Sequence, residues 1–381
     1  MTLGSRRTFL GATALAVVCL IGAATTVGRA QAGADAPAIT DTTFKNILLL
    51  KGIPVDTFLD AMGMFANAMG NDCTYCHASG AALDRDAFAV ATPRIQRARQ
   101  MIVMMNTINK QFFAGQPRVT CFTCHGGNQS PRSDPNIALQ YSTPPEDPNV
   151  RDFPTDPTGS VDQIFDRYVQ AVGGAARIAA LTSFTAKGTY EGFDTLFAKV
   201  PVDIYAQAPN RYATIVHMSA GDSVRVYNGA GGWMAGPDTP IPLITLSSGN
   251  LDRARLEALV AFPTGLKQAF PQWRVGRAVM NDQEVRVVQA AENGQPVLNL
   301  YFDEVSGILV RLVRWTLTPV GFVPTQIDYS DFRDVAGVKI PFKRTVSQTY
   351  MQMTVELTNV QPNARIDAAR FARPVPAKPA A

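Results

Sequence analysis

Several residue types are scarce in this sequence of 381 residues, and each scarcity excludes a class of protein. Charged residues make up only 17% against 46% apolar residues, which excludes a disordered chain, and the 29 glycines are too few for a collagen. The 35 basic residues barely exceed the 31 acidic ones, and three of the basic residues precede residue 33, where no acidic residue occurs. The remaining 32 basic and 31 acidic residues leave the chain nearly neutral. It therefore lacks the excess of positive charge that nucleic-acid-binding proteins carry, and we expect no nucleic-acid partner.

Histidine and cysteine are also rare, and their positions are the most informative feature of the chain. Two of the three histidines each end a Cys-x-x-Cys-His motif, at Cys73–His77 and Cys121–His125. This motif is typical of haem c attachment, because two thiols three residues apart reach both vinyl groups of one haem and the next residue reaches the iron. We therefore expect two covalently bound haems, with thioethers from Cys73, Cys76, Cys121 and Cys124 and iron ligands from His77 and His125.

Cysteines in such pairs have two other uses in proteins. Four thiols can form a zinc site, but a histidine after each pair would then be a coincidence. Two disulfides would suit an oxidising compartment, but a bond within Cys-x-x-Cys is usually redox-active, and the sequence holds no second redox feature. Haem attachment is the preferred interpretation.

The sixth iron ligand decides the chemistry of each haem. His217 is the only other histidine, and it cannot serve both irons, so both haems cannot be bis-histidine in one chain. Methionine is a soft, neutral ligand that raises the potential of haem iron, and the helix before each motif contains three. Met69 is too close to Cys73, so spacing leaves these candidates open: Met62 or Met64 for the first haem, and Met101, Met104 or Met105 for the second.

Residues 1–32 have the features of an export signal. Arg6 and Arg7 form a charged head, Phe9–Val27 is uncharged and apolar, and Ala30–Ala32 supplies a small-x-small cleavage pattern. The alternative is an uncleaved membrane anchor, because about 19 apolar residues nearly span a bilayer. We expect a periplasmic or exported protein, with membrane association if the segment is retained.

The rest of the chain predicts an α+β multidomain protein. Helical spacing runs from Phe44 to Phe113, with one helix after Pro54 and another from Pro93 that Thr92 caps. A proline-rich linker follows at 131–159, then a helix from Val161 to Val172 and many period-two strand patterns. The expected organisation is a signal peptide (1–32), a small all-α dihaem cytochrome c domain (33–130), the linker (131–159), an antiparallel β half-barrel-like domain with a packed helix (160–375) and a tail (376–381).

Three segments resemble the photosynthetic reaction-centre cytochrome c subunit family. Phe58–Met62 (FLDAM) is similar to the helix before that family's first motif, Arg97–Met101 (RARQM) to the helix before its second, and Val119–Gly127 to the second motif itself. The resemblance covers about residues 44–130 and implies that Met62 ligates iron opposite His77, and Met101 opposite His125. The photosynthetic subunits usually carry four haems, and this chain has motifs for two.

Residues 160–375 loosely resemble the periplasmic lipoprotein-carrier half-barrels, which implies an apolar ligand such as an acyl chain or a quinone. We expect the whole chain to be a non-enzymatic electron carrier. Its expected partners are redox proteins, including a membrane-bound electron-transfer complex. The alternatives are a dihaem peroxidase-like enzyme with one open iron, and a lipid- or quinone-binding or docking protein with an accessory cytochrome.

Overall fold

The computed structural model describes residues 36–82, 84–142, 149–237 and 239–376. Residues 34–381 form one compact unit. The predicted signal peptide and all but the first residue of the predicted tail lie outside the described residues. Within the described ranges, no helix is both long and apolar enough to cross a membrane.

The N-terminal part of this unit is helical, and its two expected long helices are confirmed. The first begins directly after Pro54 and ends at Gly70, whose φ of 63° is the left-handed conformation that favours glycine at a helix end. The second begins at Pro93, and the Thr92 hydroxyl accepts a hydrogen bond from the Ile95 N–H. The helices here are α1 (Thr40–Thr43), α2 (Val55–Met69), η1 (Cys73–Tyr75), η2 (Ser79–Ala82), η3 (Arg85–Ala89), α3 (Pro93–Phe112), α4 (Cys121–His125) and α5 (Ile137–Gln140).

The C-terminal part is an antiparallel sheet with 13 strands in the described residues, in the order β6-β5-β4-β3-β2-β1-β13-β12-β11-β10-β9-β8-β7. Its strands are β1 (Ser183–Gly192), β2 (Val200–Gln207), β3 (Arg211–Met218), β4 (Gly221–Tyr227), β5 (Gly232–Ala235), β6 (Ile244–Thr245), β7 (Trp273–Met280), β8 (Gln283–Glu292), β9 (Gln295–Asp303), β10 (Leu309–Thr318), β11 (Gly321–Val335), β12 (Val338–Ser347) and β13 (Gln352–Pro362). The expected mixture of helices and antiparallel strands is therefore confirmed.

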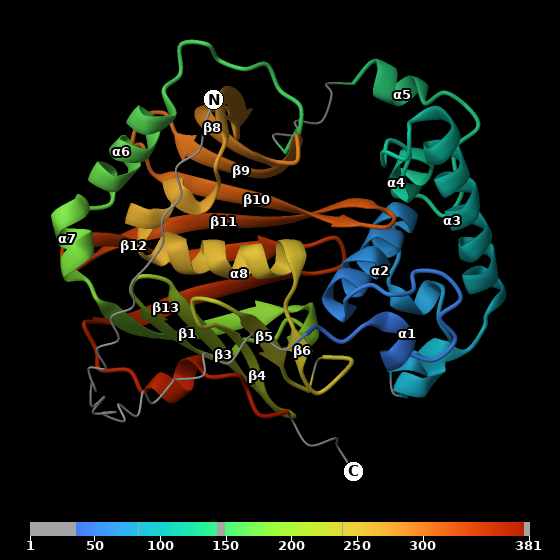
Figure 1. Ribbon diagram of the computed structural model, residues 1–381, viewed down its shortest axis with the longest axis horizontal. Helices are drawn as coiled ribbons and strands as arrows, with labels where there is room; N and C mark the ends of the chain where they lie inside the picture. The colour runs from blue at the N-terminus through green and yellow to red at the C-terminus, as the bar shows by residue number, and fades with distance from the viewer. Residues whose placement is uncertain (1–35, 83, 143–148, 238, 377–381) are drawn as a thin grey trace, which may run out of the picture. The chain divides into compact units, whose positions relative to one another are not determined.

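Three helices cover one face of this sheet: α6 (Val161–Ala171), α7 (Ala175–Ala180) and α8 (Ser248–Ala261). Alternate residues of a strand point to opposite faces, and β11 is buried at every second position over most of its length. Phe165 and Tyr168 of α6, and Leu256 of α8, join the largest buried apolar cluster against the strands. Figure 1 shows α8 lying across the strands at the centre of the sheet.

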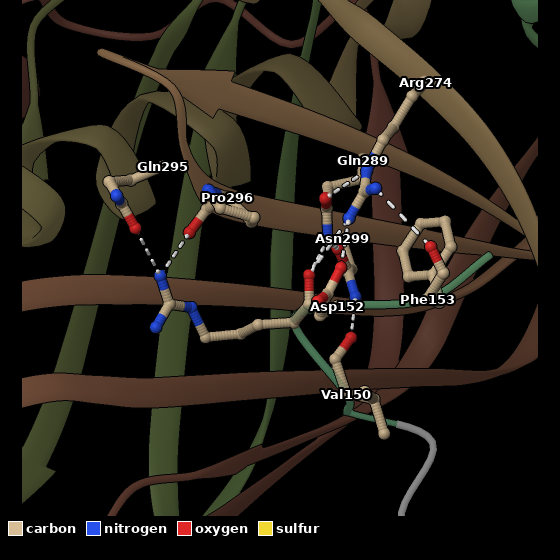
Figure 2. Close-up of polar contacts among 9 residues, drawn as sticks. Val150, Asp152, Phe153, Arg274, Gln289, Gln295, Pro296 and Asn299 are labelled. Atoms are coloured by element: carbon tan, nitrogen blue, oxygen red, sulfur yellow. Dashed lines mark hydrogen bonds and ion pairs between the residues drawn. The ribbon is translucent and has the colours of Figure 1, made fainter. Parts of the chain in front are cut away.

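The end of the predicted linker is fixed to the opposite face of the sheet. Gln289 and Asn299 are buried polar residues on β8 and β9, and their amides bond each other over 2.7 Å. The Gln289 amide also donates to the carbonyl of Arg151 over 2.9 Å, and Arg274 donates to the carbonyls of Arg151 and Phe153 (Figure 2). The end of the linker is therefore fixed against the sheet, because its backbone carbonyls accept hydrogen bonds from the Gln289 amide and the Arg274 guanidinium.

The helical part also packs against the sheet directly. A second apolar cluster joins Met64 of α2, with Ile102 and Met105 of α3, to Val320 and Val323. Val320 lies in the turn between β10 and β11, and Val323 lies near the start of β11. Figure 1 shows this hairpin extending to α2. The helix that precedes the first Cys-x-x-Cys-His motif is therefore part of a core shared with the sheet.

Candidate functional site

The first motif begins in η1, three residues after Gly70, the glycine that ends α2. Asp72 caps this turn, because its carboxylate accepts hydrogen bonds from the backbone N–H and the hydroxyl of Thr74, over 2.8 and 2.6 Å. The His77 N–H bonds the Cys73 carbonyl over 3.1 Å, which continues the helical turn through the whole motif. Residues three apart in a helical turn share a face, so Cys73 and Cys76 present their thiols to the same side.

The second motif is itself a helix, α4. Thr120 and Thr123 form a reciprocal capping box at its start, with each hydroxyl accepting a backbone N–H of the other residue. Gly126 ends the helix with a φ of 55°. The motif therefore has a fixed helical geometry between two end signals, with Cys121 and Cys124 on one face.

The structure brings the two motifs together at the C-terminal end of α2. The Gly127 N–H bonds the Ala68 carbonyl over 3.0 Å, and a Cβ at Gly70 would lie 2.3 Å from the carbonyl oxygen of Gly127. The Tyr75 hydroxyl donates to Gln129 over 3.4 Å. Groups attached to the two motifs would therefore be neighbours.

The structure pairs none of the four motif cysteines in a disulfide. Burial raises the pKa of the Cys121 thiol to about 11, and it also raises the pKa of Cys73 and Cys76. In the ranges that the structure describes, no group of three or more histidine, cysteine, aspartate or glutamate side chains is arranged to hold a metal ion.

Both motif histidines fit the role of haem ligand. The Nδ1–H of His77 donates to the Phe88 carbonyl over 2.9 Å, and that of His125 donates to the Asn128 carbonyl over 3.1 Å. A carbonyl only accepts, so each ring carries its proton on Nδ1 and keeps the Nε2 lone pair available, as metal-binding histidines usually do. Burial also lowers the pKa of His77, which favours the neutral form that ligates iron.

The candidate methionines differ in burial. Met64 and Met105 are each only 5% exposed and pack in the cluster shared with the sheet. Met104 is 46% exposed. Met62 and Met101 are half-buried and lie outside that cluster. Packing therefore accounts for Met64 and Met105, and this distribution favours the assignment that the family resemblance implies.

Met62 lies on a helix face with other half-buried apolar side chains. This face also holds Phe58, Phe65 and Met69, which are four, three and seven residues from Met62. These spacings place the four side chains along one stripe of the helix. Phe58 and Met69 lie outside the shared core, Phe65 packs at its edge, and none of the three is fully exposed. Such a stripe is suited to cover one face of a flat apolar group.

His217 lies on β3, in the sheet. Its Nδ1 is 2.8 Å from Asp222 and its Nε2 is 3.3 Å from Asp203, so each ring nitrogen faces a carboxylate. The hydrogen bond with Asp222 raises the pKa of His217. This arrangement leaves no nitrogen of His217 available to iron.

Sequence reasoning missed two buried carboxylates on α2. Asp56 accepts hydrogen bonds from the Ser247 N–H and hydroxyl over 2.6 and 2.7 Å, at the start of α8. Asp60 accepts one from the Asn250 amide over 2.7 Å, and burial raises its pKa to about 7. The available signal was their spacing, because two acids four residues apart share one face of a largely apolar helix.

Paired Cys-x-x-Cys-His turns on a helical segment, each with its histidine bonded to a main-chain carbonyl, are the features expected of a c-type cytochrome. Residues 20–146, about a third of the chain, match the family described as Photosynthetic reaction centre cytochrome C subunit. The expected resemblance is therefore confirmed, and the family suggests an electron-transfer role, haem c as cofactor and redox complexes as partners. No curated protein matches the sequence.

Solved structures similar to this chain cover its C-terminal part, as the second resemblance implied. A LolA superfamily protein from Nitrosomonas europaea is 10% identical with a TM-score of 0.38, and the match covers 56% of this chain and 98% of that one. A DUF1329 family protein from Desulfovibrio piger is 9% identical with a TM-score of 0.38, over 56% and 98%. At these scores the likeness carries no conclusion about a ligand.

Proposed function

We propose that this chain is an exported dihaem c-type cytochrome that transfers electrons by an outer-sphere route. The observation that carries the proposal is the pair of helical Cys-x-x-Cys-His turns in which each histidine ring is oriented by a main-chain carbonyl. Zinc or structural disulfides would not require a histidine at that place in both motifs.

In this proposal the chain supplies the attachment, the ligands and the enclosure. Cys73 and Cys76 hold the first haem, and Cys121 and Cys124 hold the second. His77 and Met62 would ligate the first iron, and His125 and Met101 would ligate the second. The haems supply one-electron ferric–ferrous chemistry when bound, and two protein ligands for each iron leave no position for a substrate.

The proximity of the two motifs supports exchange between the two sites. The Gly127–Ala68 hydrogen bond and the close approach at Gly70 hold α4 against α2. The core shared with the β10–β11 hairpin keeps water from one side of α2 and α3. A rigid, partly dry setting limits the rearrangement that accompanies a change in charge.

Spectroscopy of the purified, exported protein tests this function. Low-spin c-type spectra that do not change with carbon monoxide or cyanide are expected for filled axial positions. Rapid binding of either ligand at one haem would instead identify the peroxidase-like alternative.

The apolar-ligand hypothesis for the sheet has less support. A cavity of about 40 Å³ lies between α8 and the strands, lined by side chains that include Tyr212, Glu257 and Arg344. This volume has room for about three water molecules. Arg344 and Glu257 pair over 3.3 Å at the cavity, so its wall is charged as well as apolar. This cavity alone therefore gives no support for an acyl chain or a quinone at this place in the sheet.

A further inference from the structure

The tip of the β1–β2 hairpin exposes three large apolar side chains. Phe193 is 55% exposed, Leu196 is 86% exposed and Phe197 is 62% exposed. They surround the short helix η4 (Phe193–Thr195), and the two phenylalanine rings meet edge to face with centroids 6.3 Å apart. We call Phe193, Leu196 and Phe197 the apolar tip.

The backbone of the apolar tip is strained. Leu196 and Phe197 have φ values of 53° and 60°, which side chains of this size rarely adopt. Such conformations persist only where the surrounding structure determines them, and they are concentrated at functional sites.

Hydrogen bonds hold the strained backbone in place. The Thr195 hydroxyl donates to the carbonyls of Gly192 and Ala198, over 3.0 and 2.8 Å. The Phe197 N–H bonds the Gly192 carbonyl over 2.8 Å, and the Tyr190 hydroxyl donates to Asp194 over 2.6 Å. These hydrogen bonds thus fix the loop in a conformation that exposes its apolar side chains to solvent.

We infer that the apolar tip inserts into the surface of a lipid bilayer. Three apolar side chains on the end of a hairpin form a protrusion, which fits between lipid chains, whereas a protein partner would need a matching hollow. Lys199 and Lys343 at the base of the tip both pair with Glu356, over 3.2 and 2.9 Å. Since the three side chains of the tip carry no charge, their attraction to the bilayer is apolar and does not require anionic lipid.

The position of the tip connects this contact with the helical segment. Gly192 pairs with Met353 of β13, so the neighbouring hairpin end is the β12–β13 turn. That turn touches α2, because a Cβ on Gly63 would lie 2.4 Å from the Thr349 hydroxyl. When the tip is inserted, the β12–β13 turn therefore lies between the tip and α2. The helix before the first motif is then held close to the membrane, where a membrane-bound redox partner would be.

Fluorescence quenching tests the insertion. Phe197→Trp in the full chain is mixed with vesicles of phosphatidylcholine brominated on its acyl chains, and its emission should be quenched in both low and high salt. The matched control is Val305→Trp, on the β9–β10 turn, where the native side chain is 87% exposed. No quenching at position 197, or equal quenching at both positions, would overturn the inference.

A second pair of variants tests the energetic role of the tip. The double variant Leu196→Asn/Phe197→Asn introduces asparagine, which tolerates positive φ. The loop conformation should therefore be preserved while its apolar surface is lost. The partition coefficient onto phosphatidylcholine vesicles should fall about tenfold or more, and Val305→Asn should leave it unchanged. An unchanged coefficient in the double variant would contradict the role. Neither assay measures a property of the haems. A negative result in either assay would therefore overturn the membrane inference without affecting the cytochrome proposal.

Discussion

At the scale of single residues, hydrogen bonds and burial separate residues that serve structure from those suited to ligate iron. His77 and His125 each bond a carbonyl through Nδ1, and His217 is enclosed by two carboxylates. The methionines separate in the same way, since Met64 and Met105 fill the shared core. The same residue types thus have different roles because their surroundings differ.

Replacing a proposed axial methionine should change one haem and leave the other intact. Met62→Ala or Met101→Ala removes the thioether ligand, so one iron should become high-spin and its reduction potential should fall. Optical and paramagnetic resonance spectra with a redox titration measure both effects. Met104→Ala is the control for α3, and it should leave the spectra unchanged. Unaltered spectra in both test variants would show that the ligand assignment is wrong.

The His217 pair predicts a pH dependence of stability. Asp222 raises the pKa of His217 above 6.5, so the folded protein holds this proton more tightly than the unfolded chain. The stability that the pair contributes is fully present below pH 6.5 and is lost as pH rises through the raised pKa. His217→Asn should flatten the curve of unfolding free energy against pH in this range, measured by urea denaturation. An identical slope in the variant would refute the pairing.

At the scale of elements, α2 carries the most connections. One face holds the half-buried stripe with Met62, another holds Met64 in the shared core, and Asp56 and Asp60 bond the first turn of α8. Its C-terminal end lies against Gly127, after the second motif. Changes in α2 should therefore affect both the motifs and the sheet.

Removing the Asp56 carboxylate should destabilise the protein. Asp56→Ala leaves the Ser247 N–H and hydroxyl without their acceptor in a buried place, which costs about 1–3 kcal/mol. Glu284→Ala, an exposed acid on β8, is the control and should change stability by less than about 0.5 kcal/mol. Chemical denaturation measures both, and equal effects would contradict the docking role of Asp56.

Two glycines with similar backbone angles separate strain from packing at the motif contact. Gly52 has a φ of 69° with open space around it, and Gly70 has a φ of 63° with the Gly127 oxygen in the place of a Cβ. Gly52→Ala should cost about 1 kcal/mol from backbone strain alone. Gly70→Ala adds an overpacking cost of about 1–3 kcal/mol and should disturb the spectra of the haems. Equal melting temperatures for the two variants would mean that the contact contributes nothing.

The local signals of the sequence predicted most elements because each has a local cause. Thr92 and Pro93 begin α3, and period-two burial marks strands such as β11. Helix α8 was not predicted individually, because its inner face includes buried Arg253, which breaks the apolar stripe. The sheet contacts of the linker were also missed, since Gln289 and Asn299 become linker contacts only when distant segments meet.

At the scale of the whole molecule, the two Cys-x-x-Cys-His motifs could be found from sequence, and their mutual contact could not. Motif spacing is local, whereas the approach of Gly127 to Ala68 depends on how α2 and α4 pack. The division into a dihaem domain, a linker and a β domain stays a prediction. The shared core and the Asp56–Ser247 contact nevertheless connect the helical part and the sheet in one compact unit.

The most direct measurement is the intact mass and optical spectrum of the chain after export from a host that can attach haem c. We expect a red protein whose polypeptide mass is increased by two haem groups, and by one in a Cys73→Ser/Cys76→Ser variant. A colourless protein with four unmodified thiols, or with its thiols bound to zinc, would contradict it.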